Sequence, residues 1–133
     1  MKLECCGTIR PSGDFDPKQD AESLKKAMKG MGTNEKEIID ILCKRSNAER
    51  QQIREEFKSL YGESLIKELK KELSGDFESL IIGLMYSEPE YDARTLRKAV
   101  QGLGTDESVL TEILGSRTNT EIAAIKAEYY RCK

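Results

Sequence analysis

The sequence predicts an all-α protein built from repeats of five short helices. Apolar residues recur with helical spacing, no window shows sustained strand alternation, and the chain matches itself at a shift of 72 residues. Residues 21–61 align with 93–133 without gaps, and 15 of these 41 positions are identical. The first copy is complete, and the second is expected to stop after its third helix. We therefore expect a lead-in at residues 1–15, a first repeat at 16–87 and a partial second repeat at 88–133.

Caps and glycines mark the first two helices of the first copy. Asp16 followed by Pro17 is typical of an N-cap with proline at the first helical position, and Gly30 ends this helix. A second helix begins at Thr33 or Asn34, because either side chain can cap it. The positions expected to face inward in these two helices are Leu24, Ala27, Met28, Ile38, Ile41 and Leu42.

Three more helices complete the first copy. Ser46 and Glu49 form a capping box that opens the third helix, and the second copy repeats this box as Thr118 and Glu121. A fourth helix follows, and Asp76 is expected to cap the fifth. The positions expected to face inward in these three helices are Ile53, Phe57, Leu60, Leu65, Leu69, Leu73, Phe77, Leu80, Ile81, Leu84 and Met85.

The composition excludes several classes of function. The chain has no histidine, which excludes Ser-His-Asp and Cys-His catalysis and histidine-containing zinc sites. Its cysteines, Cys5, Cys6, Cys43 and Cys132, lack CxxC spacing, which argues against an all-cysteine zinc site. The net charge of -2 argues against general nucleic-acid binding. No apolar stretch suits a signal peptide or a transmembrane helix.

A loop with two glycines joins the first two helices of each copy. It spans residues 28–33 in the first copy and 100–105 in the second. Alternate glycines let such a loop turn several carbonyl oxygens toward one point, and Ca²⁺ prefers oxygen ligands of this kind. The ion also needs an anionic ligand. The acidic residues available for this role in the first copy are Glu35, Glu68, Glu72 and Asp76.

The loop and a carboxylate at a fixed distance form a recognisable signature. Gly30-Met31-Gly32-Thr33 is separated from Glu72 by thirty-eight residues, and Gly102-Leu103-Gly104-Thr105 repeats the loop. This pattern closely resembles the annexin family over nearly the whole chain. The resemblance implies an all-α fold of annexin-type five-helix repeats and Ca²⁺-dependent binding to acidic phospholipid. By position, it implies a main calcium site made by the backbone oxygens of Met28, Gly30 and Gly32 and the side chain of Glu72.

The second copy repeats the loop without its carboxylate. The carbonyl groups of Val100, Gly102 and Gly104 match the first loop, but the matching acid would fall beyond the last residue. The resemblance therefore implies a partial site there. It also implies weaker secondary calcium positions in the first copy, whose residues are Thr33, Glu35, Leu73 and Glu78.

The mechanism we expect is a calcium bridge to an acidic membrane, for example one that contains phosphatidylserine. A weakly held ion keeps coordination positions that lipid oxygens can fill, and it lets an acidic protein meet an acidic bilayer. Lys29, Met31 and Leu103 lie at the loop tips and are expected to contact lipid. We expect a cytoplasmic protein that moves to membranes when calcium rises, binds no nucleic acid and catalyses no reaction.

A second hypothesis is a helical protein-interaction fragment with little membrane binding of its own. Annexins gain membrane avidity from several sites at once, and this chain is expected to hold one complete site. The partial second repeat would also leave apolar residues without covering helices, which favours self-association or binding to protein partners. These residues are Ile113, Leu114, Ile125 and Tyr129.

Overall fold

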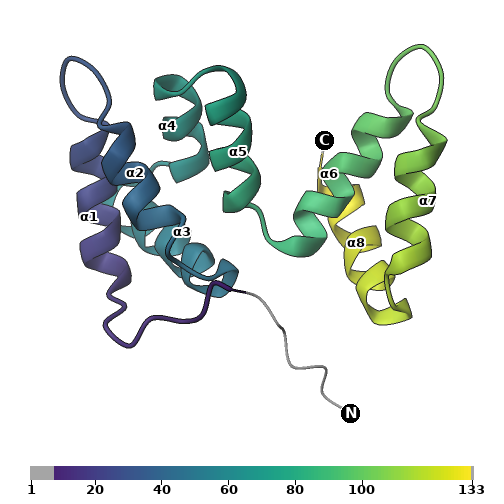
Figure 1. Ribbon diagram of the computed structural model, residues 1–133, viewed down its shortest axis with the longest axis horizontal. Coiled ribbons are helices and arrows are strands. Elements are labelled where there is room, and N and C mark those ends of the chain that lie inside the picture. The colour runs from purple at the N-terminus through teal and green to yellow at the C-terminus, as the bar shows by residue number, and fades with distance from the viewer. Residues whose placement is uncertain (1–7, 133) are drawn as a thin grey trace. The chain divides into compact units, whose positions relative to one another are not determined.

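The computed structural model describes residues 8–132, and over this range the regular structure is helical throughout (Figure 1). The predicted all-α fold is therefore confirmed. The chain divides into two compact units after Met85. We call residues 8–85 unit 1 and residues 86–132 unit 2. The first seven residues of the expected lead-in, including Cys5 and Cys6, lie outside the described residues.

Unit 1 contains five helices. They are α1 (Pro17–Ala27), α2 (Glu35–Leu42), α3 (Asn47–Tyr61), α4 (Leu65–Glu72) and α5 (Gly75–Met85). α1 packs against α2 and α3, while α4 and α5 pack against α3 and against each other. The loop between α1 and α2 and the connection between α4 and α5 lie at the same end of the unit (Figure 1).

Unit 2 contains α6 (Glu88–Val100), α7 (Glu107–Ser116) and α8 (Asn119–Arg131). α6 packs against α7 and α8 as α1 packs against α2 and α3. These three helices thus correspond in order and in packing to the first three of unit 1.

The predicted caps account for four of the eight helix starts in residues 8–132. The Asp16 carboxylate accepts hydrogen bonds from the Lys18 and Gln19 N–H groups, and the Asn34 side chain caps α2. Both predicted capping boxes are complete. Asp76 does not cap α5, because this helix already begins at Gly75, where φ is 63°. A positive φ of this size favours glycine, so the turn from α4 is made there.

The large side chains that are fully buried among the described residues all belong to unit 1. They are Leu24, Ile38, Leu42, Ile53, Phe57, Leu65, Leu69, Ile81 and Met85. The smaller core of unit 2 consists of Ala93, Leu96, Ile113, Ile125 and Cys132, with Val109, Leu110 and Tyr129 packed against it.

Two residues expected in the core of unit 1 are exposed instead. Leu60 is 38% exposed and Leu80 is 60% exposed. In α5 the buried stripe runs through Ile81, Ile82 and Met85, so Leu80 faces away from it. Because α5 is apolar on several sides, helical spacing alone could not show which side faces the core. None of the helices in residues 8–132 is long and apolar enough to cross a membrane.

Candidate metal centre

The α1–α2 loop has a backbone that requires glycine at two positions. Gly30 has a φ of 110° and Gly32 a φ of 93°, in the region that side chains other than glycine rarely adopt. The N–H of Asn34 donates to the carbonyl oxygen of Ala27 at 2.9 Å, which closes the loop onto the end of α1. The two glycines and this closing bond therefore give the loop a defined shape.

A carboxylate at the end of α4 reaches this loop. The hydroxyl of Thr33 donates a hydrogen bond to Oε2 of Glu72, at 2.9 Å, although 39 residues separate the two. Glu72 is the last residue of α4, and the end of α4 lies at the same end of unit 1 as the loop (Figure 1). The fold thus brings one acidic side chain to the loop, from the helix that packs on α3.

The α6–α7 loop of unit 2 has nearly the same backbone. Gly102 has a φ of 112° and Gly104 a φ of 93°, and the N–H of Asp106 donates to the Ala99 carbonyl at 2.8 Å. Its Thr105 makes no hydrogen bond to a carboxylate within the described part of unit 2. The two loops therefore share a shape but differ in the acid beside them.

Asp106 is the acid nearest in sequence to the second loop, and it serves as a helix cap. Its Oδ1 accepts from the Ser108 hydroxyl at 2.7 Å and from the Val109 N–H at 3.4 Å. The hydrogen bond from the Ser108 side chain, followed by that from Val109, lowers the pKa of Asp106 below its ordinary value. This carboxylate is ionised at neutral pH, but its Oδ1 already accepts hydrogen bonds as the N-cap of α7.

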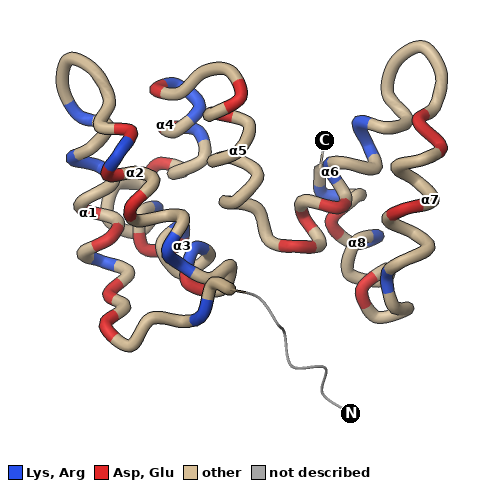
Figure 2. Tube along the Cα trace, in the orientation of Figure 1, with Lys and Arg blue, Asp and Glu red and all other residues tan. Residues whose placement is uncertain are grey.

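Both loop tips expose an apolar side chain completely. Met31 is 107% exposed and Leu103 is 111% exposed, relative to a reference residue. Lys29 is exposed beside Met31, whereas residues 101–105 carry no charged side chain (Figure 2). The three residues predicted to contact lipid are thus all open to an approaching surface.

The residues of the predicted secondary positions lie near the same end of unit 1. Thr33 is half-buried and Glu35 is in the first turn of α2. Leu73 caps the end of α4 and is buried, while Glu78 is half-buried in the first turn of α5. No hydrogen bond joins Leu73 to Glu78: their N–H groups donate to the carbonyl oxygens of Leu69 and Ser74.

The side-chain chemistry limits how an ion could be held. The described residues contain no group of three or more His, Cys, Asp or Glu side chains placed to hold a metal. The oxygens that the α1–α2 loop offers are therefore mainly neutral backbone carbonyl groups, with the carboxylate of Glu72 hydrogen-bonded to the loop. A large cation that accepts six to eight oxygen ligands, water included, suits this donor set.

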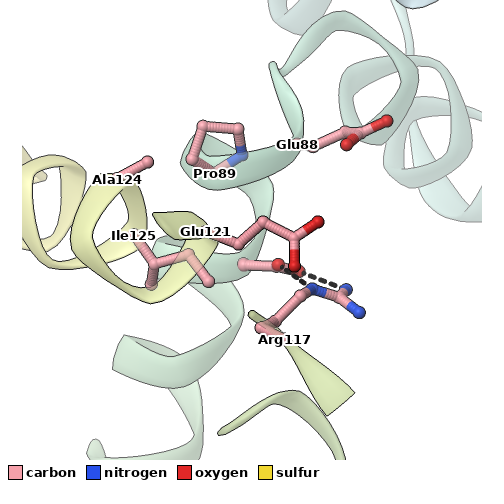
Figure 3. A pocket seen from close by; sticks show the side chains of 7 residues that line it. Glu88, Pro89, Arg117, Glu121, Ala124 and Ile125 are labelled. Atoms are coloured by element: carbon pink, nitrogen blue, oxygen red, sulfur yellow. Dashed lines mark hydrogen bonds and ion pairs between the residues drawn. The ribbon is translucent and has the colours of Figure 1, made fainter. Parts of the chain in front are cut away.

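Sequence reasoning missed an ion pair with a buried aspartate in each unit. In unit 1, Arg45 donates to both oxygens of Asp20, at 2.6 and 3.0 Å. In unit 2, Arg117 donates to both oxygens of Asp92, at 2.6 and 3.1 Å (Figure 3). The hydrogen bond that each arginine donates to its aspartate is the main cause that raises the pKa of that arginine. Both pairs recur at the 72-residue shift, and this recurrence was the signal that could have revealed them.

Comparison with known proteins agrees with this repeated helical architecture. A family model described as Annexin matches residues 19–84 and 91–131. Annexin A6 of Rattus norvegicus is 54% identical over 128 residues, which cover 96% of this chain and 19% of that protein. Annexin A5 of Rattus norvegicus is 54% identical over 123 residues, which cover 92% of this chain and 39% of that protein.

Solved structures show the same similarity. Annexin III superposes with a TM-score of 0.91 at 45% identity, over 94% of this chain and 39% of that one. Calcium-bound annexin (Sm)1 superposes with a TM-score of 0.87 at 42% identity, over 92% of this chain and 35% of that one.

The fold and its glycine loops define an all-helical protein made of repeated loop-and-helix units. The chain belongs to the annexin family. It spans about a fifth to two fifths of the length of the annexins with which it was compared.

Proposed function

We propose that this protein binds Ca²⁺ at the α1–α2 loop and, through the ion, acidic phospholipid. The ligands are the backbone oxygens of Met28, Gly30 and Gly32 together with the carboxylate of Glu72. The observation that carries the proposal is the 2.9 Å hydrogen bond from Thr33 to Glu72, because it puts an acidic oxygen beside a loop of glycine backbone. Calcium-dependent phospholipid binding is known for the family, and calcium is bound in the annexin (Sm)1 structure.

The donor set explains why membrane and ion would bind together. One carboxylate and three neutral carbonyl groups hold calcium weakly, with a dissociation constant of ~10⁻⁴ to 10⁻³ M by analogy with other sites of low charge. Coordination positions left open by the protein can take phosphoryl or carboxyl oxygens of a lipid headgroup. Calcium and lipid then raise each other's affinity by the same factor.

The charge of the protein favours a bridging ion over direct attraction. The net charge is -2, so an acidic bilayer repels the protein unless a cation lies between them. Lys29 would contact a headgroup phosphate, and Met31 and Leu103 would enter the interfacial region. The complete exposure of both apolar tips supports this role.

The remaining predicted positions would contribute less. Val100, Gly102 and Gly104 offer carbonyl groups on a loop of matching shape, but the described residues of unit 2 supply no carboxylate like Glu72. The secondary positions at Thr33 with Glu35 and at Leu73 with Glu78 hold few protein ligands. Under this proposal the protein binds and does not catalyse, and it moves from the cytoplasm to membranes when calcium rises.

Co-sedimentation with vesicles tests the proposal. The 133-residue protein is mixed with phosphatidylserine/phosphatidylcholine vesicles across a range of calcium, and with pure phosphatidylcholine vesicles as a control. We expect binding that needs both calcium and phosphatidylserine and that EGTA reverses. Binding that persists in EGTA, or that is equal on both vesicle types, would overturn the proposal.

A second candidate function is helical association with itself or with protein partners. Leu114 on α7 is 46% exposed and Tyr130 on α8 is 70% exposed, so unit 2 presents an open apolar surface. Sedimentation equilibrium without lipid separates this candidate from the first. A mass that rises with protein concentration and ignores calcium would favour association, whereas a constant monomer mass would exclude self-association.

A further inference from the structure

Lys25, in the last turn of α1, joins this helix to α3 and to the chain around the start of α4. Its Nζ lies 3.1 Å from Oε2 of Glu63 and 4.0 Å from Oε2 of Glu68. The same Nζ lies 5.6 Å from the ring centre of Phe57 and 5.2 Å from that of Tyr61. A cation over two rings and beside two carboxylates therefore connects the helix that leads into the glycine loop with the helix that carries Glu72.

The acid that Lys25 meets on α4 lies on the same face of that helix as Glu72. Glu68 and Glu72 are four residues apart in α4, so their side chains lie one turn apart on one face. Glu68 pairs with Lys25 of α1, and Glu72 accepts a hydrogen bond from Thr33 of the loop. The face of α4 that brings a carboxylate to the loop is thus also the face that Lys25 contacts.

The carboxylate of Glu68 lies between two lysines. Lys71 donates to its Oε1 at 2.5 Å, while Oε2 lies 4.0 Å from Nζ of Lys25. The hydrogen bond from Lys71 is the main cause that lowers the pKa of Glu68, and the charge of Lys25 acts in the same direction. Glu68 is therefore ionised at neutral pH and can attract the ammonium group of Lys25.

Unit 2 repeats the contact with the ring but not the link to a fourth helix. Arg97 is the counterpart of Lys25 at the 72-residue shift, and its guanidinium carbon lies 5.2 Å from the ring centre of Tyr129, the counterpart of Phe57. The counterparts of the two carboxylates that pair with Lys25 would fall beyond residue 133. A cation over this ring is thus common to both units, whereas the link to α4 belongs to the unit in which a carboxylate reaches the loop.

We propose that Lys25 is a positioning residue of the α1–α2 calcium site, which keeps α4 placed so that the carboxylate of Glu72 stays beside the loop. This inference rests on the proposed calcium-binding function. The ammonium group of Lys25 carries the same sign of charge as Ca²⁺, so it cannot be a ligand and its own field opposes binding of the ion. Any gain in calcium affinity from Lys25 must therefore come through the carboxylate that it positions.

The first experiment measures the position of Glu72 without calcium. In the ¹³C,¹⁵N-labelled 133-residue protein, the carboxyl carbon signal of Glu72 reports the hydrogen bond from Thr33, and Thr33→Val shows where this signal moves when the bond is absent. Lys25→Met retains an aliphatic stem but removes the ammonium group. We expect it to move the Glu72 signal in the same direction as Thr33→Val. Lys26→Met, at a neighbouring exposed lysine of α1, should leave the signal in place.

The second experiment measures calcium affinity from the amide signals of loop 28–33. Lys25→Met is expected to raise the dissociation constant for calcium about two- to fivefold, the effect of losing a partly exposed ion pair. Lys26→Met removes the same charge and should not raise the constant. Lys25→Arg retains a cation that can pair with both acids and should restore the affinity. In the Glu72→Gln background, Lys25→Met should cause no further loss, because the group that it positions is gone.

The sign of the change in affinity decides the proposal. A dissociation constant for calcium that is unchanged or lower in Lys25→Met would overturn it, and so would an equal loss in the Glu72→Gln background. A Glu72 signal that Lys25→Met leaves in place would also overturn it. Circular dichroism checks that each variant retains its helices. If the unchanged protein binds no calcium, the proposed function fails, and the calcium-free measurement still decides whether Lys25 keeps Glu72 at the loop.

Discussion

The two glycine loops of this annexin chain have the same backbone but different surroundings. Gly30 and Gly102 differ in φ by 2°, with values of 110° and 112°, and Gly32 and Gly104 share a φ of 93°. Yet only the first loop has a carboxylate hydrogen-bonded to its threonine among the described residues. Loop shape is therefore encoded locally, whereas the carboxylate beside the first loop is supplied by the packing of a later helix.

The cores of the two units differ for a related reason. Leu42 is fully buried in unit 1, whereas Leu114, its counterpart at the 72-residue shift, is 46% exposed. In unit 1, α4 and α5 pack against α3, and the Arg50 side chain on α3 donates to the Leu84 carbonyl on α5. The first three helices of each unit thus form the same framework, and in unit 1 α4 and α5 also cover part of α3.

The largest effect is expected from shortening the two matched leucines. Leu42→Ala should lower the free energy of unfolding by about 2–5 kcal/mol, because it removes a fully buried side chain. Leu114→Ala should cost less than about 1 kcal/mol, because the side chain is already half in water. Urea unfolding followed by circular dichroism measures both. Equal losses would mean that the two leucines are buried alike in solution.

Removing the carboxylate of Glu72 should have the next largest effect. Glu72→Gln keeps the size of the side chain but deletes the one negative charge at the loop, so half-maximal vesicle binding should require about tenfold more calcium or a greater excess. Glu55→Gln, which changes an exposed acid on α3, is the matched control and should change the calcium requirement much less. An equal rise in the calcium requirement for both variants would refute Glu72 as the calcium ligand.

The hydroxyl of Thr33 should have a smaller effect on the same measurement. Thr33→Val removes the hydrogen bond to Glu72 and should raise the calcium requirement about threefold, which corresponds to one ordinary hydrogen bond. Thr33→Ser retains the hydroxyl and should restore binding. Thr105→Val, the matched change in unit 2, should have no effect. If Thr105→Val raised the calcium requirement as much as Thr33→Val, the two loops would contribute equally and the account would be wrong.

The smallest effect is expected on the acid stability of unit 1. Burial raises the pKa of Glu49, but the hydrogen bonds from Ser46 and Ser12 outweigh it, and the net pKa lies below the ordinary value of 4.5. A lowered pKa means that the carboxylate stabilises the fold above about pH 4.5 and that this stabilisation is lost as pH falls through the folded-state pKa.

Glu49→Gln should therefore make the free energy of unfolding less dependent on pH in this acidic range. Urea unfolding between pH 6 and pH 3 measures the change, with Glu56→Gln on the same helix as control. A steeper loss of stability in Glu49→Gln than in the unchanged protein would contradict the sign of this pKa shift.

Local features of this chain were predictable from sequence. The caps of α1 and α3 and the glycine loops depend on residues a few positions apart, and the structure confirms the caps. Features that depend on packing between distant segments were less accessible. The residues alone left Glu35, Glu68, Glu72 and Asp76 as equal candidates for the acid, and only the resemblance to annexins pointed to Glu72.

The ion pair that was missed and the leucine that was misplaced also depend on packing between distant segments. Asp20 and Arg45 lie 25 residues apart with no local signature, so their ion pair appeared only when α1 and the end of α2 were placed together. Leu80 was expected in the core because α5 is apolar on most sides, yet the structure buries Ile81, Ile82 and Met85 instead. In each case the outcome depends on which neighbouring helix the segment meets.

The central claim is that loop 28–33, completed by Glu72, binds calcium more tightly than loop 100–105. A calcium titration of the ¹⁵N-labelled protein, followed by the amide signals of both loops, measures the two affinities in one molecule. We predict that the signals of loop 28–33 saturate at lower calcium than those of loop 100–105, and that Glu72→Gln removes this difference. Saturation of both loops at the same calcium concentration in the unchanged protein would contradict the account.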